Sequence, residues 1–136
     1  FVMEKLPHKF EGGLQNYAGI IGLGAAVKYL SKIGMSDIHD HEIKLRNAVD
    51  VSGLKLIGNN SGSIANFNVP GVNYHEVATI LDTSDNIMIR SGRHCVHSWY
   101  NAQNIEGSAR ASFYLYNTLD EVQVLNEALN KLKKLM

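Results

Sequence analysis

The chain has 136 residues, with 13 Lys and Arg balanced by 13 Asp and Glu, and only 19% of its residues are charged. This length fits one domain, or one piece of a larger protein, and is enough to bury a core. The neutral balance argues against nucleic acid or an anionic membrane as main partner, and no apolar run reaches the roughly 18 residues that span a bilayer. The single cysteine excludes an internal disulfide and fits a reducing cytoplasm.

Two helices are predicted in the first third of the chain, after an irregular segment. Residues 1–16 contain a proline and two glycines and follow no regular hydrophobic period. Apolar residues recur at helical spacing between Tyr17 and Leu30, and Gly34 suits a helix C-terminal cap. Ser36 can cap a second helix that continues to about residue 51. Because the chain begins with a phenylalanine, we expect it to be part of a longer polypeptide.

The middle of the chain predicts short strands around one helix. Residues 54–57 are apolar-rich, and residues 64–69 alternate between apolar and polar side chains. Asn73 and Glu76 resemble a capping box that opens a short helix. Residues 87–89 predict a further strand that leads directly into the segment with the cysteine.

Residues 109–116 alternate cleanly and predict the last strand. Ala109 and Ala111 belong to one face of this strand, and Arg110 points to the opposite face. Thr118 and Glu121 form a capping box for a final helix. The apolar stripe of that helix consists of Val122, Leu125, Leu129, Leu132 and Met136. The order of elements predicts an α+β fold, with a small, mainly antiparallel sheet covered by helices.

The segment Arg90-Ser91-Gly92-Arg93-His94-Cys95 has the composition expected around a reactive thiol. The thiolate is the nucleophilic form of cysteine, and neighbouring positive charge favours it. A buried structural thiol is the alternative and the commoner state of a lone cysteine. Composition alone leaves open a protease-like Cys–His pair, a metal site or an acceptor thiol for group transfer. Structural zinc usually has four ligands in repeated spacings, so we expect no metal here.

Arg110 is a second candidate site residue. It lies in the run Ser108-Ala109-Arg110-Ala111-Ser112, whose short side chains shield it little. The planar guanidinium fork binds carboxylates in bidentate fashion. The alternative is a structural ion pair with an Asp or Glu elsewhere, and residue type alone favours that alternative.

Several separated motifs resemble the cysteine desulfurases, pyridoxal-phosphate enzymes of the aminotransferase class V group. The cysteine segment is followed by Arg110-Ala111-Ser112, Tyr116-Asn117-Thr118 and Glu121-Val122, and is preceded by Phe10-Glu11-Gly12-Gly13-Leu14-Gln15-Asn16. The short interval between the cysteine and the arginine is similar to the SUF-type, group II branch. The resemblance implies that this chain is the C-terminal small domain of a fold-type I pyridoxal-phosphate enzyme. Residues 1–16 would be an inter-domain segment that reaches the pocket, and residues 17–136 the small domain, with the cysteine loop at residues 90–100.

The resemblance also implies roles for individual residues. Cys95 would attack the sulfur of L-cysteine, leaving L-alanine and a Cys95 persulfide. Arg110 would hold the substrate carboxylate, and Asn16 would lie near the substrate. Arg90 and His94 would line the loop and support the thiolate.

Pyridoxal 5'-phosphate would be bound mainly by a large domain that is not part of this chain. The family's cofactor-bearing lysine lies in a serine-glycine-histidine-lysine motif, and no lysine here has that context, so we expect the chain alone to be inactive. Gly13 would lie near the cofactor. The family often has threonine at the position of Leu14, where it contacts the cofactor phosphate across a dimer, and leucine cannot donate that hydrogen bond.

The partners implied by the resemblance are L-cysteine, a sulfur-acceptor protein and a second copy in a homodimer. The sulfur would serve iron–sulfur cluster or thio-product biosynthesis in the cytoplasm. Two alternatives remain open. A selenocysteine lyase would use the same thiol and cofactor, and a non-enzymatic binding module would reuse the domain without its chemistry.

Overall fold

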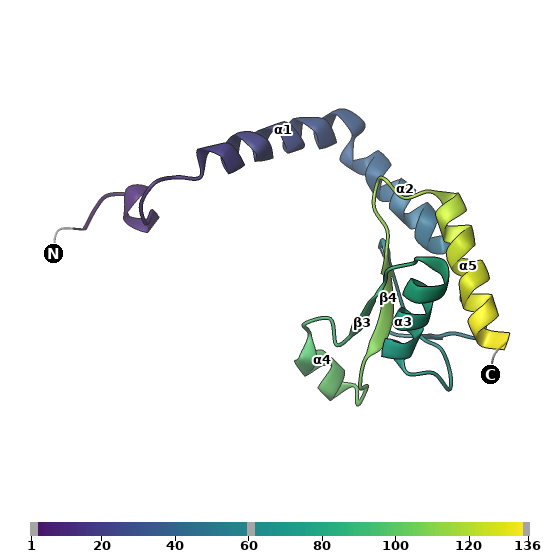
Figure 1. The fold of residues 1–136 in the computed structure, drawn as a ribbon. Coiled ribbons are helices and arrows are strands. Elements are labelled where there is room, and N and C mark those ends of the chain that lie inside the picture. Colours follow the sequence, from purple (N-terminus) through teal and green to yellow (C-terminus); the bar gives the residue numbers. More distant parts are fainter. Residues whose placement is uncertain (1–2, 60–61, 135–136) are drawn as a thin grey trace. The chain divides into compact units, whose positions relative to one another are not determined.

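The computed structural model describes residues 3–59 and 62–134 of the chain. The chain forms two compact units, Phe1–Met35 and Ser36–Met136. The boundary between these units lies after Met35. The division after residue 16 that the family resemblance implies stays a prediction. The helices and strands are labelled in Figure 1.

The first unit consists of a 3-10 helix, His8–Phe10, and the helix α1, Tyr17–Ile33. The 3-10 helix is one turn of regular structure in a segment that we expected to be irregular. Asn16 caps α1, because its Oδ1 accepts a hydrogen bond from the Gly19 amide at 3.0 Å. Gly34, with φ of 103°, ends α1 as predicted. None of the described residues of this unit is buried, and the apolar side chains of α1 are largely exposed.

The second unit is built on a four-stranded antiparallel sheet with the order β1-β2-β4-β3. Its strands are β1 (Lys55–Leu56), β2 (Ile64–Asn68), β3 (Arg90–Gly92) and β4 (Ser108–Ser112). The predicted α+β fold with a small antiparallel sheet is confirmed. In the described sheet β3 is an edge strand that pairs with β4.

Helices cover this sheet. They are α2 (Met35–Asn47), α3 (Tyr74–Asp85), α4 (His97–Ala102) and α5 (Leu119–Lys134). Buried side chains of α2, α3 and α5 join those of the sheet in one hydrophobic core. In Figure 1, α4 lies across β3 and β4 from α5.

Side chains alternate between two faces along β2 and β4. Phe67 and Ala109 are opposite each other in the register and are fully buried. Ala65 and Ala111 lie on the same face and are also buried, whereas Arg110 points to the opposite face and is half-buried. The predicted orientation of Arg110 away from the core is therefore correct.

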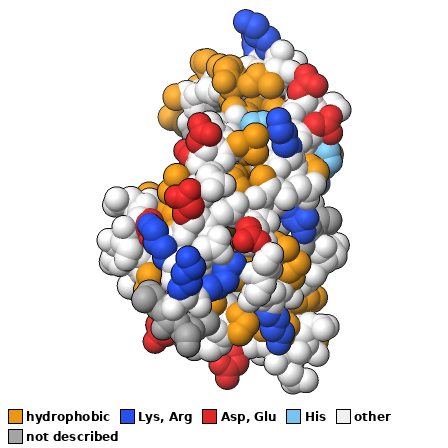
Figure 2. All heavy atoms as spheres, turned by 90° about the vertical axis from the view of Figure 1, so that its right-hand side faces the viewer, with side chains coloured by type: hydrophobic (Ala, Val, Ile, Leu, Met, Phe, Trp, Pro, Cys, Tyr) orange, Lys and Arg blue, Asp and Glu red, His pale blue; other side chains and the backbone are white. Residues whose placement is uncertain are grey.

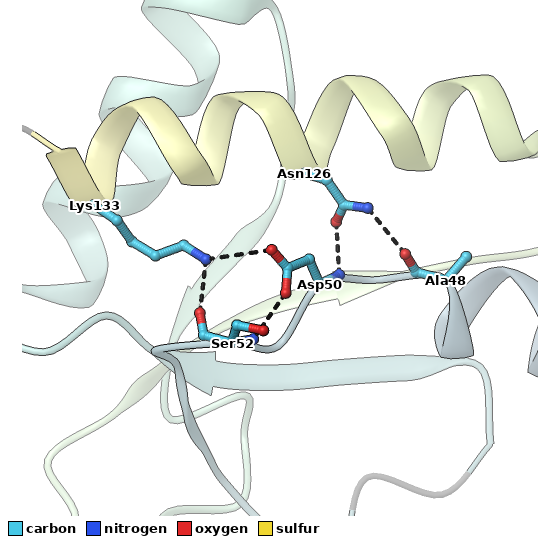
Figure 3. A network of polar contacts seen from close by, with 5 residues as sticks. All are labelled: Ala48, Asp50, Ser52, Asn126 and Lys133. Carbon is cyan, nitrogen blue, oxygen red and sulfur yellow. Dashed lines mark hydrogen bonds and ion pairs between the residues drawn. The ribbon is translucent and has the colours of Figure 1, made fainter.

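Polar contacts fasten the segment after α2 to α5 (Figure 3). The Asn126 amide group accepts a hydrogen bond from the Asp50 amide at 2.8 Å and donates one to the Ala48 carbonyl at 2.9 Å. Lys133 Nζ donates to the Ser52 carbonyl at 2.7 Å. Hydrogen bonds from the Ser52 hydroxyl and amide lower the pKa of Asp50, and the charge of Lys133 adds to this. These contacts hold the chain where it leaves α2 for the sheet.

The surface seen in Figure 2 carries charges of both signs with apolar side chains between them, in keeping with the neutral balance of the sequence. Within residues 3–59 and 62–134, none of the helices is both long and apolar enough to cross a membrane.

The predicted strand at residues 109–116 is too long. It ends at Ser112, after which the chain turns into α5. The Phe113 amide donates to the Ser63 carbonyl at 2.9 Å, and the Asn117 side chain accepts from the Tyr114 amide at 3.0 Å. After Ser112 these hydrogen bonds take the place of further strand pairing by β4.

The strand predicted at residues 87–89 is also misplaced. The ladder starts at Arg90, and the apolar side chains of Ile87 and Ile89 pack against the core without strand pairing. The loop around the cysteine is therefore shorter than the predicted residues 90–100, because the first of these residues belong to β3 and the last belong to α4. The helix α4 was not predicted.

The capping box at the start of α5 is confirmed. Thr118 Oγ1 accepts from the Glu121 amide at 3.2 Å, and Glu121 Oε2 accepts from the Thr118 amide at 2.8 Å. The second helix begins at Met35, so Ser36 is its second residue and does not cap it. Met136, assigned to the apolar stripe of α5, lies outside the described residues.

Candidate functional site

A tight left-handed turn presents the cysteine. Gly92, His94 and Cys95 have φ angles of 110°, 52° and 64°. Such angles are costly for residues with a Cβ, so two in succession indicate a conformation imposed by the surroundings. The turn joins β3 to α4, and the Cys95 side chain is exposed at its tip. Among the described residues Cys95 is therefore not a buried thiol.

The two arginines of the motif have different tasks. Arg90 Nη2 donates a hydrogen bond to Cys95 Sγ at 2.8 Å. Arg93 instead donates to the Glu106 carbonyl at 2.9 Å and to Asn101 Oδ1 at 2.7 Å. Arg93 thus ties the turn to the end of α4, and Arg90 is the cation at the sulfur.

A buried hydrogen-bond network lies beneath the turn. Ser108 is fully buried, and its hydroxyl donates to Asn66 Oδ1 at 2.6 Å. Its oxygen also contacts Tyr100 Oη and, at 3.0 Å, His94 Nε2. A hydroxyl has one proton and two lone pairs, so once Ser108 donates to Asn66, both Tyr100 and His94 donate to Ser108. His94 therefore carries its proton on Nε2.

The surroundings of His94 keep its ring neutral. Burial, followed by the charges of Arg110 and Arg90, lowers the pKa of His94 below its ordinary value of 6.5, against an opposing hydrogen bond to the Ser108 backbone. Its Nδ1 is buried and has no hydrogen-bond partner. A neutral His94 leaves the positive charge of the site on the arginines.

Arg110 lies next to Arg90 across the sheet. The two residues are directly opposite in the β3–β4 register, and Asn66 is opposite Arg110 on the other side. Their side chains therefore share the polar face of the sheet. Arg110 Nε is buried without a hydrogen-bond partner. A buried guanidinium N–H without an acceptor costs free energy, and a bound anion would accept its hydrogen bond.

A cavity of about 310 Å³ opens on this face. Arg110 and His94 line it, beside the Cys95 turn, and apolar side chains complete its wall. The full lining is Ile57, Gly58, Asn59, Ile64, Asn66, His94, Val96, Trp99, Tyr100 and Arg110. Such a cavity has room for a small amino acid, with a cation for its carboxylate.

Two predicted site residues belong to the first unit. Asn16 is the cap of α1, and Gly13 has φ of 101° in the exposed segment before it. Their predicted places near substrate and cofactor stay predictions. In the described part of the chain, no group of three or more His, Cys, Asp or Glu side chains is placed to hold a metal ion.

Sequence reasoning missed the residues under the turn. Ser108, Tyr100 and Asn66 come from three elements that meet only in the folded sheet. The only local signal was the alternation of polar and apolar residues along β2 and β4. This alternation places Asn66 and Ser108 on the same face of the sheet as Arg110.

A family model for aminotransferase class-V matches residues 1–125 of the chain. The chain belongs to the aminotransferase class-V family. Members of this family depend in general on pyridoxal phosphate. A probable cysteine desulfurase of Synechocystis sp. is 40% identical over 139 residues, which cover 95% of this chain and 33% of that protein.

Solved structures agree with this assignment. The apo cysteine desulfurase from Thermococcus onnurineus NA1 is 35% identical, with a TM-score of 0.91 over 100% of this chain and 36% of its own. The cysteine desulfurase CsdA from Escherichia coli is 28% identical, with a TM-score of 0.87 over 98% and 34%. The resemblance to cysteine desulfurases is confirmed, and the chain spans about a third of the length of these relatives.

Proposed function

We propose that this chain is the C-terminal part of a cysteine desulfurase and supplies the thiol that takes sulfur from L-cysteine. The observation that carries the proposal is the exposed Cys95, whose sulfur accepts a hydrogen bond from Arg90 at 2.8 Å. A thiolate accepts such a bond from a cation more strongly than a thiol does. The likeness to proteins named cysteine desulfurase supports this reaction class.

In the proposed step, the Cys95 thiolate attacks the sulfur of L-cysteine. A bond forms between Cys95 Sγ and that sulfur while the bond from the sulfur to the substrate carbon breaks. The electron pair of the broken bond stays with the substrate, whose carbon takes up a proton to become L-alanine. The transferred sulfur remains on Cys95 as a persulfide, ready for an acceptor.

Arg110 would bind the substrate carboxylate. Its buried, unpartnered Nε and its place in the cavity wall suit a bidentate pair with a carboxylate. The neutral His94 beside it does not compete with Arg110 for the anion, because a neutral imidazole is a much weaker partner. L-Cysteine would thus be held at its carboxylate, within the cavity that adjoins the Cys95 turn.

The residues of this chain fit the substrate side of a pyridoxal-phosphate site and only part of the cofactor side. Such sites hold the cofactor on a lysine, and none of the cavity's described lining residues is a lysine. The lysine would therefore come from a preceding large domain, while Gly13 would contribute from this chain. When bound, pyridoxal phosphate supplies the electron sink that makes the carbon–sulfur bond of the substrate cleavable.

The proposal extends to the partners of the enzyme. An exposed Cys95 leaves a persulfide within reach of a sulfur-acceptor protein, as iron–sulfur cluster or thio-product biosynthesis requires. A homodimer of the full-length protein is part of the same proposal.

The test is turnover of L-cysteine by the full-length protein loaded with pyridoxal phosphate. We expect the wild type to form L-alanine and the Cys95→Ser variant to lose this activity, with an unchanged cofactor absorbance spectrum. The matched control is Ser98→Ala, an exposed residue of α4 outside the cavity lining. Alanine formation by Cys95→Ser at the wild-type rate would remove Cys95 from the reaction.

A further inference from the structure

We propose that His75 is a positioning residue that holds Arg90 against the Cys95 sulfur from the opposite face of the sheet. This inference rests on the proposed function, because it assigns Arg90 the task of supporting the reactive thiol. His75 is not part of the cysteine motif and lies 20 positions before Cys95 in the sequence.

The strand that carries Arg90 is weakly held by its own ladder. β3 has three residues, lies at the edge of the sheet and pairs with β4. Its register places Arg90 directly opposite Arg110, and like charges in this arrangement repel. The sheet alone therefore favours movement of Arg90 away from its place.

His75 contacts the residue after Arg90. Its Nδ1 forms a hydrogen bond with Ser91 Oγ at 2.8 Å, and this is the one side-chain hydrogen bond between α3 and β3 within residues 3–59 and 62–134. Ser91 points to the face opposite Arg90, since side chains alternate along a strand. The same imidazole lies against Gly92, where an added Cβ would be 3.6 Å from His75 Cε1.

His75 is itself fixed. The Asn73 side chain, which caps α3, accepts a hydrogen bond from the His75 amide at 2.8 Å. The Tyr74 ring lies beside the imidazole, with 4.5 Å between ring centroids. The start of α3 thus holds the strand between Arg90 and the left-handed turn, so the guanidinium and the sulfur keep their 2.8 Å contact.

The readout is the rate at which iodoacetamide alkylates Cys95 in the full-length protein without L-cysteine, measured on the Cys95 peptide by mass spectrometry. We expect His75→Ala and Ser91→Ala to slow alkylation about three- to tenfold, the effect of losing one hydrogen bond. Ser91→Thr retains the hydroxyl and should restore the rate. His39→Ala removes an exposed histidine of α2 and should leave it unchanged.

A double variant separates positioning from a general loss of structure. Arg90→Ala combined with His75→Ala should alkylate no more slowly than Arg90→Ala alone, because His75 acts through Arg90. A wild-type rate in His75→Ala, or an equal slowing in the Arg90→Ala background, would overturn the proposal.

The two proposals fail separately. If the wild type forms no L-alanine while the alkylation pattern holds, the desulfurase function is wrong and the positioning of Arg90 stands. If the wild type forms L-alanine while His75→Ala alkylates normally, the function stands and the role of His75 is wrong.

Discussion

The two faces of the four-stranded sheet use the same strands for different purposes. On one face, Ala65, Phe67, Ala109 and Ala111 are buried against the helices and build the core. On the other face, alternate residues of the same strands hold polar groups around a cavity and the cysteine turn. Because side chains alternate with a period of two, stability and chemistry are encoded one residue apart. Changes at neighbouring positions should therefore have separable effects.

The largest expected effect on stability comes from the core face. Phe67→Ala removes a fully buried ring and should lower the free energy of unfolding by about 3–5 kcal/mol. Native-state hydrogen exchange at the amides of β2 and β4 measures this locally in the full-length protein. A loss below about 1 kcal/mol would show that the sheet does not depend on this face for its core.

The corresponding change on the polar face is Arg110→Ala. It should weaken L-cysteine binding by about 2–3 kcal/mol, the loss of a charge-assisted pair, and leave exchange in β4 nearly unchanged. Steady-state kinetics give the apparent KM, and Arg46→Ala in α2 is the matched control. An unchanged KM with accelerated exchange would make Arg110 a structural residue instead.

A smaller effect is expected outside both faces. Thr118→Ala removes one half of the capping box of α5 and should cost about 1 kcal/mol of stability. The free energy of unfolding measures it, and Thr118→Ser should recover most of the loss. Turnover at saturating L-cysteine should not change. If Thr118→Ala lowers both turnover and the free energy of unfolding, stability and activity are not separable at this position.

The smallest effect concerns the charge of His94. The pKa of His94 is lowered in the folded protein. Near and below pH 6.5, His94 therefore binds more protons in the unfolded chain than in the folded one. The free energy of unfolding should therefore fall as pH drops from 6.5 towards the lowered pKa of His94.

The control for this prediction is His94→Asn, because asparagine tolerates the left-handed backbone and does not titrate. The difference in unfolding free energy between wild type and variant should decline between about pH 7 and pH 5. The pKa values of Asp50 and Glu121 are also lowered, from 3.8 and 4.5. These two carboxylates therefore change the free energy of unfolding mainly below this pH window. A difference independent of pH would contradict the neutral state of His94.

Local sequence signals predicted the elements that local physics decides. The alternation around Arg110, the Thr118–Glu121 capping box and the Gly34 cap each depend on residues close in sequence. The position of β3 was not predictable in this way, because strand pairing with β4 places the ladder at Arg90 despite the apolar residues before it. Propensity favoured those apolar residues, and tertiary pairing overruled it.

The same distinction holds for the candidate site. The composition around Cys95 and the short side chains around Arg110 made both residues candidates, and the resemblance to cysteine desulfurases supplied their proposed roles. The contacts that prepare them were not visible, because Ser108, Asn66 and His75 come from separate elements that meet only when the sheet forms. Six residues of α4 are also too few to show a helical period.

The most direct test of the proposed role of Cys95 is the mass of the Cys95 peptide after the full-length, pyridoxal-phosphate-loaded protein reacts with L-cysteine. We expect a gain of one sulfur atom on Cys95, which disappears on treatment with a thiol reductant and does not form in Arg110→Ala at low L-cysteine concentration. L-Alanine formed without added sulfur on Cys95, under conditions that preserve persulfides, would contradict it.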